Sequence, residues 1–172
     1  TASIIGVGKN GTLVRSTNGT SWATVTSGTS DELQGAAYGA GRYIVTGANG
    51  RILTSTDAGV TWTQASSGVS ANLGDLVYLN STFLISSDLG LPLKSTDGTT
   101  WTSSTVAGGN QLQGIAYGAG RYVAVAAGGR IITSLDATTW SNATSGTTAD
   151  LNGVAFGNGK FLATSATAVF TS

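Results

Sequence analysis

The sequence predicts an all-β chain made of one short repeat, each copy of which contributes a small antiparallel sheet. The first observation is a recurring phrase that ends in tryptophan, and its spacing is regular: the 4 tryptophans of the chain lie 40, 39 and 39 residues apart. The second is that no segment has the 3.6-residue apolar period of an amphipathic helix, so we expect essentially no helix. The copies of the phrase are at residues 16–22, 55–62, 95–101 and 134–140.

Each copy contains four short runs of β-branched, aromatic and small residues, separated by clusters of glycine, asparagine and aspartate. Such runs predict strands joined by tight hairpins. In the third full copy the runs are at residues 112–117, 121–126, 130–134 and 140–144. Four antiparallel strands in about 39 residues, repeated along the chain, are typical of β-propeller blades. The first strands are expected to begin at Leu33, Leu73, Leu112 and Leu151.

We therefore predict a single β-propeller domain over residues 1–172, with incomplete blades at both ends. Residues 3–9 align with a second strand, and Ser172 aligns with the serine that opens the repeated phrase. Five blades are favoured, although a ring of four, or completion of the open edges by another copy of the chain, also fits. The blade repeats are expected at about 1–30, 31–70, 71–109, 110–148 and 149–172.

The copy at residues 55–62 reads Ser-Thr-Asp-Ala-Gly-Val-Thr-Trp and resembles the Asp-box, or BNR repeat, of sialidase-like and photosystem-assembly-factor-like β-propellers. The resemblance implies that this phrase forms the hairpin between the third and fourth strands of a blade. It does not imply one function, because such repeats occur in glycosidases, lectin-like proteins, receptors and photosystem assembly factors. The positions to which it assigns a structural role are Ser16, Asn18, Trp22, Ser55, Asp57, Gly59, Trp62, Ser95, Asp97, Trp101, Ser134, Asp136 and Trp140.

The residue types of the phrase suit a turn on physical grounds as well. An Asp or Asn side chain can accept hydrogen bonds from N–H groups of its own turn, and glycine supplies a positive φ. Tryptophan can cover the apolar side of the hairpin. Three copies are one residue shorter than the copy at 55–62, the first has Asn18 instead of aspartate, and the fourth has no glycine. These changes affect the turn type and not the fold.

Composition narrows the classes of function. Charged residues make up 9% of the chain, against roughly 25% in an average domain. The balance of 8 basic and 8 acidic residues leaves no electrostatic footprint for nucleic acid or an anionic membrane. No apolar run approaches the roughly 18 residues of a transmembrane helix, so we expect no membrane insertion. Low charge and abundant Gly, Ser and Thr favour an extracellular or cell-surface location. The start Thr1-Ala2-Ser3 is interpreted as a processed or trimmed product.

The sequence favours a protein that is not an enzyme and has no cofactor or metal. There is no His and no Cys, so a Ser-His-Asp hydrolase is excluded and the commonest zinc ligands are missing. The aspartates of the repeated phrase are interpreted as turn-forming residues rather than calcium ligands. The arginines fall at repeat positions and do not form the arginine triad of sialidases, and Glu32 is the only glutamate.

We predict a non-catalytic, secreted or surface binding module for a glycan or a protein. The alternative is a structural subunit of a homo-oligomer or extracellular filament, assembled when one copy completes the blades of the next. A trimmed or engineered repeat fragment without its own function is a third possibility. The predicted ligand-binding residues lie in the loops that lead into the first strands: Asp31, Glu32, Gln34, Asn72, Asp75, Asn110, Gln113, Asp150 and Asn152.

Overall fold

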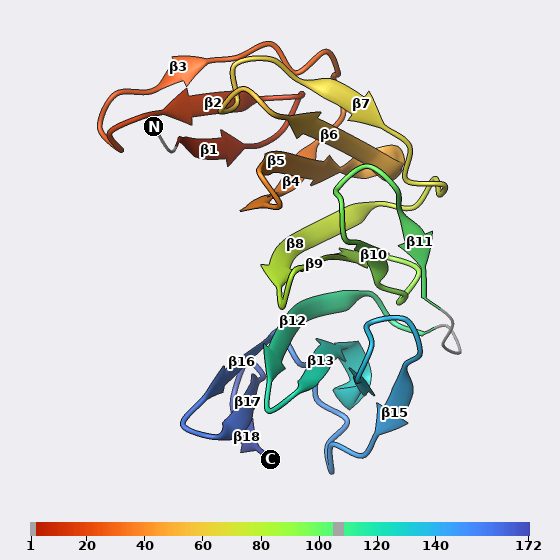
Figure 1. Cartoon of the computed structure of the whole chain (residues 1–172). Coiled ribbons are helices and arrows are strands. Elements are labelled where there is room, and N and C mark those ends of the chain that lie inside the picture. Colours follow the sequence, from red (N-terminus) through yellow and green to blue (C-terminus); the bar gives the residue numbers. More distant parts are fainter. Residues whose placement is uncertain (1–2, 105–108) are drawn as a thin grey trace. The chain divides into compact units, whose positions relative to one another are not determined.

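The computed structural model describes residues 3–104 and 109–172 of the chain. In that part the strands form five antiparallel sheets of three or four strands (Figure 1). The only helical elements there are two three-residue 3-10 turns, η1 (Ala48–Gly50) and η2 (Ala127–Gly129). The all-β prediction and the prediction of incomplete first and last sheets are therefore confirmed.

The chain divides into two compact units, Thr1–Ile85 with Ser95–Thr102 and Ser86–Lys94 with Ser103–Ser172. The prediction of a single domain stays a prediction, and each unit is described by itself. The first unit contains the sheet β1 (Ile4–Val7), β2 (Leu13–Ser16) and β3 (Ala23–Thr24), and the sheet β4 (Leu33–Gly39), β5 (Arg42–Gly47), β6 (Arg51–Ser55) and β7 (Thr63–Ala65).

The third sheet has residues in both units. The fourth and fifth sheets lie entirely in the second unit. The third sheet is β8 (Leu73–Leu79), β9 (Thr82–Ser87), β10 (Leu93–Ser95) and β11 (Thr102–Ser103). The sheets of the second unit are β12 (Leu112–Gly118), β13 (Arg121–Ala126), β14 (Ile131–Ser134) and β15 (Ser141–Ala143), followed by β16 (Gly153–Gly157), β17 (Lys160–Thr164) and β18 (Val169–Thr171).

The first two strands of the sheets β4–β7 and β12–β15 are joined by two-residue turns with an aromatic pair on either side. In β4 and β5, Tyr38 lies opposite Tyr43 with ring centroids 4.6 Å apart. The two turn residues between these strands, Ala40 and Gly41, both have positive φ, as tight hairpin turns of this kind require. The predicted hairpins are confirmed here.

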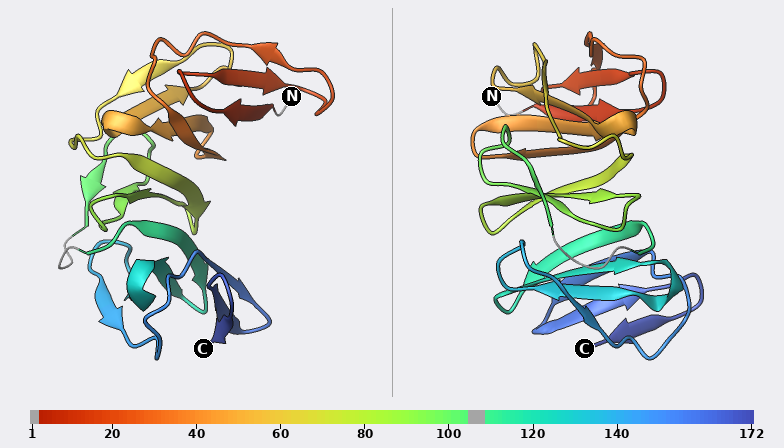
Figure 2. Two further views of the ribbon diagram at one scale, coloured as in Figure 1. Left: turned by 180° about the vertical axis from the view of Figure 1, so that it is seen from behind. Right: turned by 90° about the vertical axis from the view of Figure 1, so that its right-hand side faces the viewer.

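Within each unit, two consecutive first strands lie side by side and pack through glycine. In the first unit a Cβ on Gly35 of β4 would lie 2.6 Å from the carbonyl oxygen of Gly74 in β8. In the second unit a Cβ on Gly114 of β12 would lie 3.3 Å from the Cα of Gly153 in β16, and β12 runs beside β16 (Figure 2). The missing side chains allow these backbones to approach closely.

The cores lie between consecutive sheets. In the first unit the buried cluster of Leu13, Leu33, Val45 and Leu53 includes residues of the first two sheets, with Trp62 packed against it. The second unit has a comparable cluster, in which Val125 of β13, Leu151 and Ala163 of β17 are buried.

The last sheet begins two residues later than predicted, at Gly153 and not at Leu151. The backbone N–H of Leu151 donates to the carbonyl of Ala126, at the end of β13, at 3.2 Å. Its side chain is fully buried in the core. Leu151 therefore fastens the connecting chain to the preceding sheet before β16 starts.

Candidate functional site

The four copies of the repeated phrase, which we call the repeat turns (residues 16–22, 55–62, 95–101 and 134–140), connect the last two strands of each of the first four sheets. In the last of them Asp136 Oδ1 accepts hydrogen bonds from the backbone N–H groups of Thr138 and Thr139, each at 2.8 Å. The hydroxyl of Ser134 donates to the same carboxylate at 2.9 Å. Asn18, Asp57 and Asp97 accept two backbone hydrogen bonds each in the same way.

These hydrogen bonds stabilise the ionised form of the carboxylates. The hydrogen bonds from Thr139 and Thr138 and from the Ser134 hydroxyl lower the pKa of Asp136 to about 2. The pKa of Asp57 is well below its usual range, chiefly because the Thr61 hydroxyl donates to it. The pKa of Asp97 is likewise lowered, first by the backbone N–H of Thr100. At neutral pH these groups are ionised acceptors within their own turns.

We expect Asp136→Asn to weaken the acid sensitivity of the protein. Because the folded-state pKa of Asp136 is lowered to about 2, its contribution to stability is present above the unfolded pKa of about 3.9 and is lost as the pH falls toward 2. The variant should keep its turn, since Asn18 makes the same backbone bonds in the first repeat turn. Thermal unfolding at pH 7, 4 and 2 checks this: the melting temperature of the variant should fall less on acidification. The converse change, Asn18→Asp, should steepen the fall, and an equal slope in all three proteins would contradict the prediction.

Among the predicted ligand-binding residues, Asp31 is held in a network within the first unit. Arg51 forms a salt bridge with it, with Nη2 2.6 Å from Oδ2, and the side-chain amide of Asn49 donates to Oδ1 at 3.0 Å. The hydrogen bond from Arg51 is the largest cause that lowers the pKa of Asp31. The amide oxygen of Asn72 accepts from the N–H of Asn49 at 3.2 Å, so the structure brings Asp31 and Asn72 to the same turn, η1.

The second unit repeats this arrangement around η2. The carboxylate of Asp150 accepts from the N–H of Gly128 at 2.8 Å, as Asn72 does from Asn49. Asn110 donates its side-chain amide to the carbonyl of Ala127 at 2.8 Å. These four predicted residues therefore hydrogen-bond the loops that precede the first strands to the 3-10 turn of their own unit.

The other five predicted residues, Glu32, Gln34, Asp75, Gln113 and Asn152, have exposed side chains. Gln34 and Gln113 lie at register shifts in β4 and β12, where a bulge turns a side chain out of the regular pleat. That these residues bind one ligand stays a prediction.

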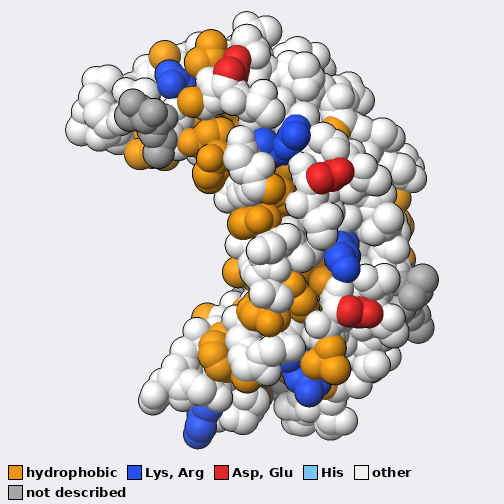
Figure 3. Space-filling view, in the orientation of Figure 1, with side chains coloured by type: hydrophobic (Ala, Val, Ile, Leu, Met, Phe, Trp, Pro, Cys, Tyr) orange, Lys and Arg blue, Asp and Glu red, His pale blue; other side chains and the backbone are white. Residues whose placement is uncertain are grey.

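Basic residues contact the repeat turn of the following sheet, which the sequence did not reveal. In the first unit Arg15 Nε donates to the carbonyl of Ala58 at 2.7 Å. In the second unit Lys94 Nζ donates to the carbonyl of Asp136 at 2.6 Å. The side chain of Arg42 lies over Gly98, where a Cβ would be 2.7 Å from its Cδ. On the face that Figure 3 shows, acidic side chains lie near basic ones, and other basic side chains stand apart.

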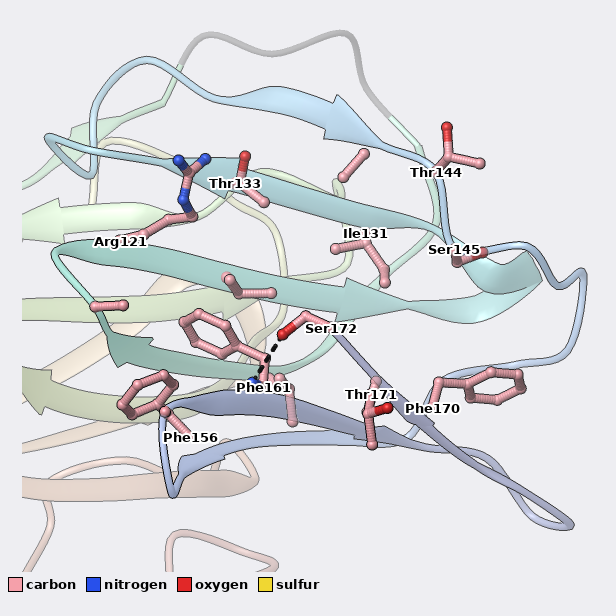
Figure 4. A pocket seen from close by; sticks show the side chains of 16 residues that line it. Arg121, Ile131, Thr133, Thr144, Ser145, Phe156, Phe161, Phe170, Thr171 and Ser172 are labelled. Carbon is pink, nitrogen blue, oxygen red and sulfur yellow. Dashed lines mark hydrogen bonds between the residues drawn. The ribbon is translucent and has the colours of Figure 1, made fainter.

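A cavity of about 380 Å³ opens in the second unit between the sheets β12–β15 and β16–β18. Arg121, Ile131 and Thr133 project into it from β13 and β14, and Phe161 and Phe170 line it from β17 and β18 (Figure 4). Arg121 is exposed, and its guanidinium forms no hydrogen bond or ion pair with another residue in the described ranges. The cavity therefore combines an apolar floor with an available cation.

None of the cavity residues is among the predicted ligand-binding residues, because the prediction considered the loops before the first strands. A signal existed in the repeat alignment. The last sheet contains only β16, β17 and β18 in the part of the chain that is described, whereas the three preceding sheets have four strands, and residues of β18 line the cavity.

Within residues 3–104 and 109–172, no group of three or more acidic side chains is placed to hold a metal ion. Nor does that part of the chain contain a helix with the length and hydropathy needed to cross a lipid bilayer.

No protein-family model and no curated protein matches the sequence, but solved structures do. YCF48 bound to D1 peptide is similar with a TM-score of 0.74 and 18% identity, over 95% of this chain and 57% of that one. YCF48 from Cyanidioschyzon merolae has a TM-score of 0.70 and 14% identity, over 94% and 59%. The WD40 repeats of RRP9 have a TM-score of 0.79 and 11% identity, over 98% and 58%.

The chain thus has a β-propeller fold, built from blades of three or four antiparallel strands. It spans 57–59% of the length of these three similar structures. At identities of 11–18% the similarity concerns the fold.

Proposed function

We propose that this chain is a non-catalytic propeller module that binds a protein segment in the cavity of the second unit. The observation that supports this most is the cavity itself, with the cation of Arg121 beside an apolar floor. Apolar surface supplies affinity for a peptide, and a few polar groups fix its orientation. The carboxylates of Asp31, Asp57, Asp97 and Asp136 accept hydrogen bonds that stabilise their ionised forms, which does not suit a general acid at neutral pH.

A further observation favours a protein ligand over a sugar. One of the similar structures is a complex of YCF48 with a D1 peptide. The alternative ligand that the sequence suggests is a glycan, bound by the exposed polar residues before the first strands. We also propose, from the sequence, that the protein is secreted or lies on the cell surface.

Selection of a random displayed peptide library on the immobilised chain tests the proposal. Ala143 lines the cavity and is exposed, so Ala143→Phe should fill the cavity without disturbing the core. Selected peptides are expected to lose at least 10-fold in affinity for this variant. The matched control is Ala166→Phe, an exposed alanine in the turn between β17 and β18. Glycan-array binding without peptide binding would overturn the proposal in favour of a sugar ligand.

A homo-oligomer or filament is the second candidate function. It is the alternative that the sequence predicts, and among the described residues β1 pairs only with β2 and β18 only with β17. Edges of this kind can pair with another chain. Light scattering across a range of protein concentrations tests it, together with negative-stain microscopy. A monodisperse monomer at all concentrations would exclude assembly.

A further inference from the structure

A groove lies in the first unit between the strand β3 and the repeat turn of the second sheet, and we call it the first-unit groove. Its volume of about 530 Å³ is in the range of small-molecule sites, and it is lined by Arg15, residues 23–26 and residues 60–62. The chain continues from β3 into β4 and from the turn into β7, all within the first unit. Both sides of the groove are therefore present in full.

One face of the first sheet forms one side of the groove. Arg15 in β2 is the cross-strand partner of Ala23 in β3, and Val25 lies two residues further along, where its N–H still bonds to β2. Because alternate residues and cross-strand partners point to the same face of a sheet, these three side chains share one face. Val60, which is 54% exposed, and Trp62 line the opposite side. The groove thus has apolar surface on both sides.

The repeat turn at residues 55–62 differs from the others in its length and in the hydrogen bond of its tryptophan. It has one residue more than the other three copies. The indole N–H of Trp62 donates to the carbonyl of Gly59 in its own turn at 3.1 Å, whereas that of Trp140 donates to the hydroxyl of Ser104, next to β11, at 3.1 Å. Trp62 is half-buried, while Trp140 is 4% exposed. The longer turn therefore presents part of an indole ring to the groove.

Arg15 supplies the groove with a cation that forms no ion pair within residues 3–104 and 109–172. Its Nε donates to the carbonyl of Ala58 at 2.7 Å, and its two Nη atoms have no hydrogen-bond partner in those ranges and reach solvent. The carboxylate of the same turn, Asp57, accepts instead from the hydroxyl of Thr61 at 2.6 Å and from backbone N–H groups. The Nη atoms of Arg15 can therefore donate to an anionic ligand.

The second unit shows the same repeat position in a closed form. Lys94 stands where Arg15 does, and its Nζ donates to the carbonyl of Asp136 at 2.6 Å and to the hydroxyl of Thr138 at 2.9 Å. The ammonium group and the indole ring of Trp140 are thus both engaged by the protein itself. In the first unit the corresponding cation and ring are both partly open.

We propose that the first-unit groove binds a small aromatic carboxylate. The carboxylate accepts hydrogen bonds from Nη1 and Nη2 of Arg15, since a guanidinium presents paired N–H donors that match its two oxygens. The aromatic body lies between Val25 and Trp62 and removes apolar surface of both from water. This site is separate from the cavity of the second unit and does not depend on the proposed function.

Titration of the ¹⁵N-labelled whole chain with 3-phenylpropanoate tests the inference, with the indole N–H signals of the tryptophans as the readout. The signal of Trp62, assigned from Trp62→Phe, is expected to move saturably while that of Trp140 stays. The neutral amide 3-phenylpropanamide has almost the same shape and should bind about 3- to 10-fold more weakly. Acetate has the charge without the aromatic body and should bind at least about 10-fold more weakly.

Variants of the chain locate the site. Arg15→Thr should weaken binding of 3-phenylpropanoate about 3- to 10-fold, and the fold accepts a threonine here, since Thr54 and Thr133 occupy the same repeat position. The matched control Lys9→Thr removes a positive charge from an exposed side chain outside the groove. Lys9→Thr, and Ala143→Phe in the cavity of the second unit, should bind as the unaltered chain does. Far-ultraviolet circular dichroism verifies that each variant keeps the fold.

Three results would overturn the inference. They are an unmoved Trp62 signal at millimolar 3-phenylpropanoate, equal affinity for the acid and its amide, and equal affinity of the Arg15→Thr and Lys9→Thr chains for the acid. Binding of glucuronate without binding of 3-phenylpropanoate would assign the groove to a sugar acid and would also overturn it.

Discussion

Replacing Gly129 by alanine is expected to destabilise the second unit by more than about 2 kcal/mol, in two ways. Gly129 has a φ of +72°, which costs an L-residue about 1–2 kcal/mol. A Cβ there would also lie 1.9 Å from the carbonyl oxygen of Thr147, so the backbone of the loop before the last sheet would have to move. Gly11 and Gly50 occupy the same repeat position and meet the carbonyls of Thr29 and Val69 in the same way.

The matched control for this prediction is Gly146→Ala. Gly146 has a φ of +73°, but no atom lies within 4 Å of the Cβ that alanine would add. Its cost should therefore be the conformational penalty alone, about 1–2 kcal/mol. Urea denaturation followed by circular dichroism measures both variants. Equal losses would show that the contact with Thr147 does not constrain the loop.

Trp140→Ala should destabilise the second unit by about 3–5 kcal/mol, the range for deletion of a buried aromatic side chain. Trp140 is 4% exposed, packs at the edge of Tyr122 with ring centroids 6.5 Å apart, and donates its indole N–H to Ser104. Its removal would leave a cavity and would remove one of the two hydrogen bonds of the Ser104 hydroxyl, which also donates to the carbonyl of Pro92 at 2.8 Å. The free energy of unfolding from urea titrations is the measurement.

The first tryptophan is the control for this change. Trp22 holds the same place in its repeat but is 47% exposed. We therefore expect Trp22→Ala to cost much less than Trp140→Ala. A similar loss in both variants would contradict this. It would mean that the repeated phrase itself, and not the packing of one sheet on another, sets how much its tryptophan contributes to the free energy of unfolding.

Most of the fold could be predicted because its determinants are local. The strands are short, each is bounded by turn residues, and the period of 39–40 residues repeats them along the chain. A hairpin such as that between β4 and β5 depends on Ala40 and Gly41 and on the tyrosines on either side, all within a few residues. The incomplete first and last sheets also followed from counting strands in the repeat.

The site was less predictable because its determinants are distant in sequence. Asp31 and Asn72 were predicted as ligand-binding residues from their polar character and position. Only the fold shows that both make hydrogen bonds to the turn at Asn49. The contact of Arg15 with Ala58 spans 43 residues, and no local pattern indicates it.

The sequence by itself determined the all-β class, the period, the hairpin turns and the incomplete sheets at both ends, since each depends on backbone preferences within one repeat. The tertiary structure decided which tryptophans are buried, which polar residues fasten loops, and where a cavity lies. Those properties depend on which sheet packs against which. Trp22 and Trp140 end the same repeated phrase, yet one is 47% and the other 4% exposed, because burial depends on the neighbouring sheet and not on the phrase itself.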